Sequence, residues 1–109
     1  MLGIKQGVRI WYVSGITNMR YGKYRLFSEV EAAGGNPYNG DAYCFMSRNH
    51  QMIKIIRYER HKRYLYDITF DPGFKFMKVV STEGKTLCEC DYTQRTALLE
   101  CPVIPHLKI

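Results

Sequence analysis

Residues 8–33 read VRIWYVSGITNMRYGKYRLFSEVEAA, and the hydrophobic pattern changes its period within this stretch. Between residues 8 and 13 the side chains alternate between two largely apolar faces, which indicates a short strand covered on both sides. From Thr17 onward apolar residues recur at helical spacing, and Thr17 or Asn18 can cap the first turn. Gly34 supplies a residue that tolerates positive φ at the end of such a helix. We therefore predict a strand followed by a long helix over residues 17–33.

The rest of the chain alternates between short strand patterns and turns. Residues 34–41, GGNPYNGD, form a turn-rich connection. Strands are predicted over residues 42–47, 52–58, 64–70, 74–80 and 86–90, and a short helix over residues 93–100. The expected fold is a single α+β domain over residues 1–109, in which the N-terminal strand and the long helix pack on an antiparallel β-meander and a short C-terminal helix follows.

Composition favours a small globular domain with an anionic partner. The chain has 109 residues, of which 46% are apolar and 24% charged, and its formal net charge is +6. An excess of positive charge favours nucleic acid over a membrane surface as the partner. No hydrophobic run approaches the roughly 18 residues of a membrane helix, and the first residues lack the apolar core of a secretory signal. We expect a cytoplasmic protein that does not bind membranes.

The sequence contains four cysteines, which raise the question of a metal site. Cys88 and Cys90 would share one face of a strand, and with Cys101 and a histidine they could complete a tetrahedral zinc site. The candidate histidines are His50, His61 and His106. Their spacing fits none of the common zinc patterns, so small buried thiols are the favoured interpretation and no metal or cofactor is expected.

Catalytic motifs do not appear in this sequence. It has no phosphate-binding loop, no dinucleotide fingerprint and no nucleophile elbow, and no catalytic residue is assigned. What stands out is a set of cations interleaved with tyrosines, which suits phosphate contacts and base stacking, although solvated strands and small cores use the same residues. The predicted nucleic-acid-binding residues are Arg20, Lys23 and Arg25 in the helix, and Lys54, Arg57, Arg60, Lys62 and Arg63 in the hairpin that follows.

Several short motifs recur in an order that is known from one family. They are Arg9-x-Trp11; Gly15-x-Thr17-Asn18-Met19-Arg20-x-Gly22; Pro37, Asn39 and Gly40; Arg48-Asn49; and Lys54 with Tyr58. With this order and spacing the chain resembles the small accessory protein of insertion sequence 66 transposable elements, the TnpB-type product of their second open reading frame. The family usually has Asp where Asn18 stands, and the segment 78–92 is longer than the family pattern.

The resemblance implies a non-catalytic protein that supports DNA transposition, while the transposase is a separate chain. We expect it to bind DNA through the basic helix and hairpin surface. One alternative is an interaction module that binds the transposase and never touches DNA, through the aromatic face around Tyr64, Tyr66 and Phe70 or through an open strand edge. Another is a redox or zinc-dependent enzyme built on the cysteines, which predicts bound metal in the purified protein.

Overall fold

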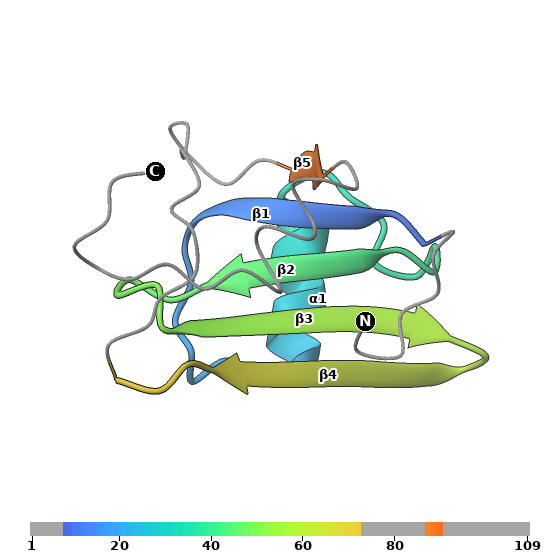
Figure 1. The fold of residues 1–109 in the computed structure, drawn as a ribbon. Coiled ribbons are helices and arrows are strands. Elements are labelled where there is room, and N and C mark those ends of the chain that lie inside the picture. The colour runs from blue at the N-terminus through green and yellow to red at the C-terminus, as the bar shows by residue number, and fades with distance from the viewer. Residues whose placement is uncertain (1–7, 73–86, 91–109) are drawn as a thin grey trace.

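Residues 8–72 and 87–90 are described by a computed structural model of the chain. In chain order the elements are β1 (Ile10–Ile16), α1 (Lys23–Ala32), β2 (Ala42–Met46), β3 (Met52–Glu59), β4 (Lys62–Thr69) and β5 (Leu87–Cys90). The strands form one five-stranded sheet in the order β4-β3-β2-β1-β5, and α1 crosses one of its faces (Figure 1).

The sheet is mixed, because β1 and β2 are parallel whereas every other neighbouring pair is antiparallel. Parallel neighbours cannot be joined by a tight turn and need a crossover, which α1 and its flanking loops supply here. The predicted fold class is therefore wrong. The described part is mostly β, with one short helix. Its strands β2, β3 and β4 form an antiparallel meander, but β1 adds to it in parallel and β5 continues the sheet beyond β1, so the sheet is mixed.

The helix is shorter than the 17–33 prediction, with 10 residues beginning at Lys23. Its N-cap is Gly22, which makes no side-chain capping bond. Asn18 uses its capping oxygen earlier, accepting a hydrogen bond from the Arg20 N–H at 2.9 Å in a local turn. The Thr17 N–H donates to the Met46 carbonyl at 3.3 Å, which keeps the chain against the sheet at this point. Residues 17–22 are thus a loop, and the helix ends as predicted near Gly34, whose φ is +90°.

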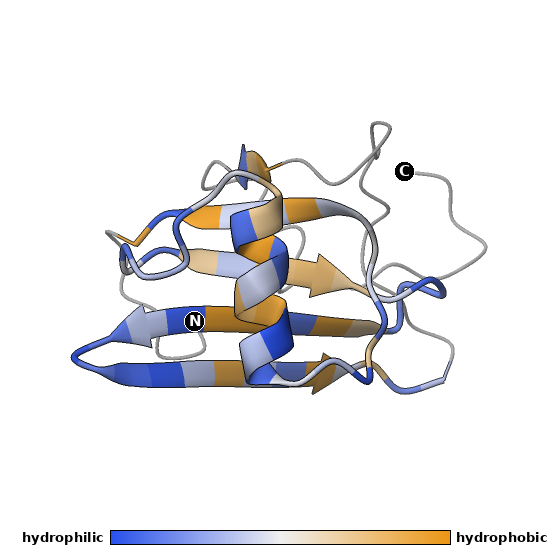
Figure 2. Ribbon diagram, turned by 180° about the vertical axis from the view of Figure 1, so that it is seen from behind, coloured by the Kyte–Doolittle hydropathy of each residue, from blue (hydrophilic) through white to orange (hydrophobic). Residues whose placement is uncertain are grey.

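The core lies on both faces of the sheet. Between α1 and the sheet lie Leu26, Phe27 and Val30 of the helix with Val13, Tyr43, Phe45 and Ile56 of the strands. On the opposite face lie Ile10, Tyr12, Ala42, Cys44, Met46, Ile53 and Ile55. Figure 2 shows α1 crossing the strands on the first of these faces. Because β2 and most of β3 are buried on both sides, their sequences read as nearly continuous apolar runs.

Most strand predictions are confirmed. The predicted strands at 42–47, 52–58 and 64–70 correspond to β2, β3 and β4, and the predicted strand at 86–90 corresponds to β5. The predicted strand at 74–80 and the predicted helix at 93–100 lie outside the described residues. Strand alternation was therefore the dependable signal in this chain.

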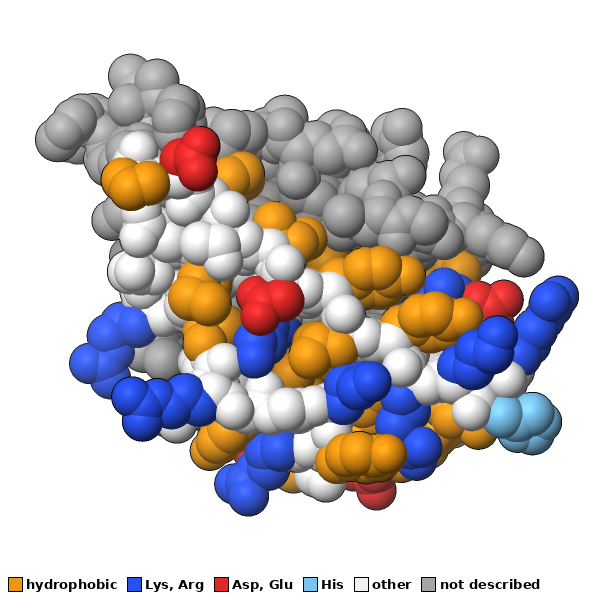
Figure 3. Space-filling model, turned by 90° about the horizontal axis from the view of Figure 1, so that it is seen from below, with side chains coloured by type: hydrophobic (Ala, Val, Ile, Leu, Met, Phe, Trp, Pro, Cys, Tyr) orange, Lys and Arg blue, Asp and Glu red, His pale blue; other side chains and the backbone are white. Residues whose placement is uncertain are grey.

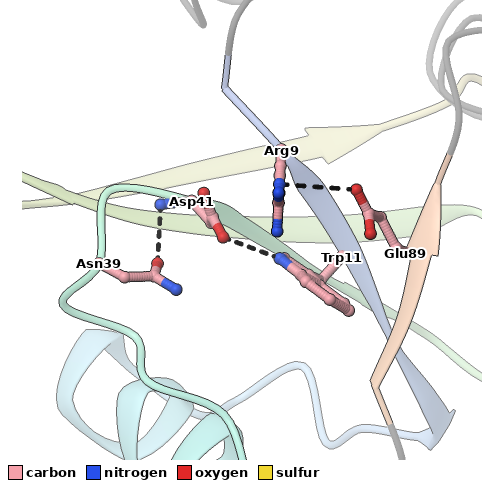
Figure 4. A network of polar contacts seen from close by, with 5 residues as sticks. All are labelled: Arg9, Trp11, Asn39, Asp41 and Glu89. Carbon is pink, nitrogen blue, oxygen red and sulfur yellow. Dashed lines mark hydrogen bonds and ion pairs between the residues drawn. The ribbon is translucent and has the colours of Figure 1, made fainter.

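Polar contacts tie β1 to the segments on either side of it (Figure 4). The Trp11 indole N–H donates to the Asp41 carboxylate at 2.9 Å, and the Asp41 N–H donates to the Asn39 side-chain oxygen, also at 2.9 Å. Arg9 forms an ion pair with Glu89 of β5 at 3.8 Å. The Arg-x-Trp motif and the turn before β2 thus hold neighbouring strands in place.

Candidate nucleic-acid interface

Two loops meet at the carboxyl ends of the parallel strands. Residues 17–22 follow β1, and residues 47–51 join β2 to β3. Between them is an open depression lined by Thr17, Asn18, Met19, Tyr21, Ser47, Arg48, Asn49 and Met52. Both loops carry exposed guanidinium groups, which belong to Arg20 in the first and to Arg48 in the second.

Local hydrogen bonds hold the second of these loops in one shape. The Asn49 side-chain oxygen accepts from the Ser47 hydroxyl at 2.8 Å and from the Gln51 N–H at 3.1 Å. The Ser47 hydroxyl in turn accepts from the Met52 N–H at 3.1 Å. Side chains that bond to nearby backbone groups in this way stabilise turns. Arg48 is therefore presented from a well-braced loop.

Lys54 anchors the first loop, residues 17–22, to β3. Its side chain points to the α1 side of β3, is 7% exposed, and donates from Nζ to the Tyr21 carbonyl at 3.0 Å. The sequence predicted Lys54 as a phosphate contact. The structure places its ammonium group on the loop that presents Arg20, where it acts as an anchor between β3 and the start of α1.

Arg57 is also buried, at 6% exposure, but on the opposite face of β3. It forms an ion pair with Glu59 and lies over the Tyr64 ring at 4.9 Å. Burial alone would lower the pKa of this guanidinium, but hydrogen bonds with Tyr66 and Glu59 outweigh burial and raise its pKa above the ordinary value. Arg57 therefore remains charged while it is enclosed by its own neighbours.

The turn between β3 and β4 presents its cations to solvent. Arg60, His61 and Lys62 are all exposed. The φ angles of Arg60 and His61 are +48° and +64°, so both central residues of this two-residue hairpin turn are in the left-handed region. Such a turn strongly favours Asn-Gly, because L side chains are strained at positive φ. A strained, cation-bearing turn is the kind of local exception that accompanies function.

The helix contributes Lys23 and Arg25, which are both exposed. Arg25 donates to Glu29 at 3.3 Å and lies 4.7 Å from the centre of the Tyr21 ring, so part of its charge is already compensated. Lys23 has no carboxylate partner within residues 8–72 and 87–90.

Arg63 lies on the α1 side of β4 among aromatic rings. Its guanidinium carbon is 5.1 Å from the centre of the Tyr24 ring and 5.5 Å from that of Tyr38. A hydrogen bond with the Tyr38 side chain raises the pKa of Arg63. The group is thus charged, half-buried and stacked rather than extended into solvent.

The predicted cations do not form one cluster. They occur at both ends of the sheet and along the side formed by β4 and the start of α1, and Figure 3 shows Lys and Arg side chains distributed across this side with apolar groups between them. We call this surface the basic track, and its exposed members are Arg20, Lys23, Arg25, Arg48, Arg60 and Lys62. The prediction omitted Arg48, although the Arg48-Asn49 motif marked it.

The described residues show no metal-binding cluster. Across residues 8–72 and 87–90 no group of three or more His, Cys, Asp or Glu side chains is placed to hold a metal ion. Cys44 is buried and Cys88 is exposed, and neither forms a disulfide. Cys101 and His106, which the zinc alternative needs, lie outside the described residues.

No helix in the described part is long and apolar enough to cross a membrane.

Comparison with known proteins identifies the family. The chain matches the profile of the IS66 Orf2-like proteins over residues 8–105. It belongs to the IS66 Orf2-like family. No curated protein and no solved structure shows significant similarity to it. Family membership implies an accessory role in transposition and suggests that this role is not catalytic.

In this IS66 Orf2-like chain, one part of the motif set behind the resemblance gathers in the two loops and their anchor. Thr17, Asn18 and Met19 line the depression together with Asn49, and Lys54 bonds to the loop between them and α1. Motifs that are separated by some thirty positions in the sequence thus form one braced structure, with Arg20 and Arg48 on its outside.

Proposed function

We propose that this IS66 Orf2-like protein supports transposition by binding DNA along the basic track. The observation that carries the proposal is that most of the exposed cations of the track lack carboxylate partners in the described part of the chain. Arg20, Lys23, Arg48, Arg60 and Lys62 are exposed, and in the described part of the chain none of them pairs with a carboxylate. Cations without partners on one side of a basic protein suit a phosphate backbone.

The spacing of the track also suits an extended polyanion. Arg60 and the loop that carries Arg48 are at opposite ends of β3, which has eight residues and therefore measures about 26 Å. A double helix presents a phosphate about every 3.4 Å along each strand, so both ends of the track can lie on one DNA segment. Buried Lys54 and Arg57 are left out of this contact surface because their charged groups already have partners.

The test is DNA binding by the purified chain at two salt concentrations. A labelled duplex carrying the terminal repeats of the element is compared with a scrambled duplex at about 50 and 200 mM salt, a range over which phosphate contacts lose much of their affinity. We expect binding that weakens steeply with salt. Preference for the repeats would add base recognition, and no binding at the lower salt concentration would exclude the proposal.

Double variants at each end of the track locate the contacts. Arg20→Ala with Arg48→Ala, and separately Arg60→Ala with Lys62→Ala, should each flatten the log-log salt dependence by about 1.8, or 0.9 per lost phosphate contact. Arg9→Ala is the matched control, because Arg9 is exposed but lies beside β5, where it pairs with Glu89. Equal slopes in all three variants would remove the track from the binding surface.

A second candidate function is binding to the transposase itself. The observation that favours it is the edge position of β4 in the described sheet, together with the parallel rings of Tyr64 and Tyr66, whose centres are 6.5 Å apart. An edge strand with aromatic side chains can pair with a strand of another protein. A complex with the transposase that persists at high salt would support this function, since phosphate-driven binding fades there.

A further inference from the structure

Two tyrosines stand out on the surface of the described chain. Tyr24 on α1 and Tyr38 in the α1–β2 connection are 72% and 42% exposed, and they are the exposed large hydrophobic residues of the described part. Both lie against the same side chain, Arg63 of β4, with ring centres 5.1 Å and 5.5 Å from its guanidinium carbon. Within residues 8–72 and 87–90, the most exposed aromatic side chains therefore gather around one cation.

The rings around Arg63 come from several elements of the fold, and one of them belongs to the buried core. Arg63 also lies 5.5 Å from the Phe27 ring centre and 5.7 Å from that of Tyr58. Phe27 is a residue of α1 whose side chain is buried in the core. The Tyr38 ring meets the Tyr58 ring edge-on at 5.1 Å. Contacts of this kind fix the orientation of rings and cation. The outer surfaces of Tyr24 and Tyr38 are therefore held in place before anything binds.

The guanidinium is not fully used within the protein. The Arg63 Nε atom is buried and has no hydrogen-bond partner. A carboxylate or solvent would satisfy this atom in a purely structural role, whereas here the guanidinium carbon lies over four aromatic rings, among them that of the exposed Tyr24. The result is two exposed phenol rings that adjoin a partly buried guanidinium group.

Tyrosine rings and arginine planes together recognise unpaired nucleobases. Any base can stack on an aromatic ring, and a neighbouring cation strengthens binding without selecting a sequence. Lys23 precedes Tyr24 in the first turn of α1, is exposed, and can neutralise a phosphate next to a stacked base. Paired bases cannot reach this surface in the same way, because they are already stacked inside the double helix.

We propose that Tyr24, Arg63 and Tyr38 form a stacking platform for an unpaired base of single-stranded DNA. The platform lies on the α1 side of β4, within the basic track, so the proposal rests on the proposed DNA-binding function and adds the form of DNA that the track receives. The chain then holds DNA in which part of one strand is unpaired, with phosphates on the track cations and a base on Tyr24.

The test compares single-stranded and duplex DNA. Fluorescence anisotropy with a labelled oligothymidylate of about 12 nucleotides, a length within the usual site sizes, measures single-strand binding. Tyr24→Ala should weaken it by about tenfold, as expected for the loss of one stacked base. The same variant should bind duplex DNA as the unmodified protein does. Since Tyr24 is mostly exposed, its replacement leaves the core intact.

A replacement and a matched control separate stacking from other causes. Tyr24→Trp keeps a stacking surface and should bind the oligothymidylate at least as well as the unmodified protein, with quenching of the added indole on binding. Tyr64→Ala is the control, because Tyr64 of β4 is also a partly exposed tyrosine but lies on the opposite face of the sheet, against Arg57. It should leave single-strand binding unchanged.

The possible results distinguish this inference from the proposed function. If the protein binds duplex DNA but Tyr24→Ala binds the oligothymidylate normally, the stacking platform is overturned and the basic track stands. If the unmodified protein binds neither form, both proposals fall. Selective loss of single-strand binding in Tyr24→Ala, with recovery in Tyr24→Trp, supports the platform.

Discussion

The interior of β3 and the turn that follows it carry similar residues in opposite situations. Lys54 and Arg57 are 7% and 6% exposed, and their charged groups bond to the Tyr21 carbonyl and to Glu59. Arg60 and Lys62, only a few positions later, are exposed and have no carboxylate partner among the described residues. Lys54 and Arg57 stabilise the folded protein through internal contacts, whereas Arg60 and Lys62 are available to a ligand.

This difference shows that a run of cations is not a single functional unit. A strand sends successive side chains to opposite faces, and in β3 both faces are buried. A cation in such a strand must find a partner inside the protein, because an unpaired buried charge is expensive. A cation in the turn meets no such demand. Three variants, two of them with a matched control, test this distinction.

The largest effect is expected when the buried ion pair of Arg57 is broken. Glu59→Gln leaves the guanidinium, whose side chain is 7% exposed, without a carboxylate. We expect the free energy of unfolding to fall by about 3 kcal/mol, at the lower end of the range for a broken buried pair because Glu59 is itself partly exposed. Urea unfolding followed by circular dichroism measures this change.

Glu29→Gln on α1 is the matched control for this substitution. It removes the same carboxylate from a pair with Arg25, whose side chain is 61% exposed. Surface pairs at this spacing contribute about 0.3–0.5 kcal/mol, so stability should hardly change. Equal losses in the two variants would contradict the distinction between the buried and exposed cations.

A smaller loss is expected for Lys54→Met, which keeps the length of the side chain but removes its donor. The Tyr21 carbonyl then loses the bond from Nζ, and we expect unfolding to become easier by about 2 kcal/mol. Amide hydrogen exchange in residues 17–22 should become faster, because the loop loses its anchor. Lys62→Met, at an exposed position, should change stability by no more than about 0.5 kcal/mol. An undisturbed loop in Lys54→Met would show that the bond to Tyr21 is dispensable.

The smallest effect on stability is expected at the turn, and it has the opposite sign. Arg60→Asn combined with His61→Gly places the preferred pair at the two positions of positive φ. We expect stability to rise by about 1 kcal/mol. The log-log salt dependence of DNA binding should flatten by about 0.9, because one cation is lost from the track. A more stable variant with unchanged DNA binding would show that the strained turn is not used for DNA.

Strand positions could be predicted from the sequence because alternation is a local property. The faces of β1 are a good example. Ile10 and Tyr12 lie on one side of the sheet and Trp11 and Val13 on the other, as their order in the chain indicates. The start of α1 could not be predicted in the same way. Thr17 and Asn18 have the side chains of helix caps, but the Thr17 backbone N–H bonds to the Met46 carbonyl and the Asn18 side chain closes a local turn, so the helix begins later.

The candidate site was predicted in part. Arg20, Lys23, Arg25, Arg60 and Lys62 are exposed, as a contact surface requires, although DNA binding itself stays a prediction. Lys54 and Arg57 were grouped with them because sequence shows the charge of a side chain but not the burial of the strand that carries it. Arg63 was taken as a simple cation, because its ring neighbours come from α1, the connection before β2, and β3.

The amino-acid order alone is enough to establish the family, the positive charge and the places of the strands, since each of these depends on composition or on neighbouring residues. The mixed sheet, the late start of α1, the burial of Lys54 and Arg57 and the rings around Arg63 all come from contacts between distant segments. Such contacts have no local pattern, because a side chain is exposed or enclosed only once the other elements have packed against it.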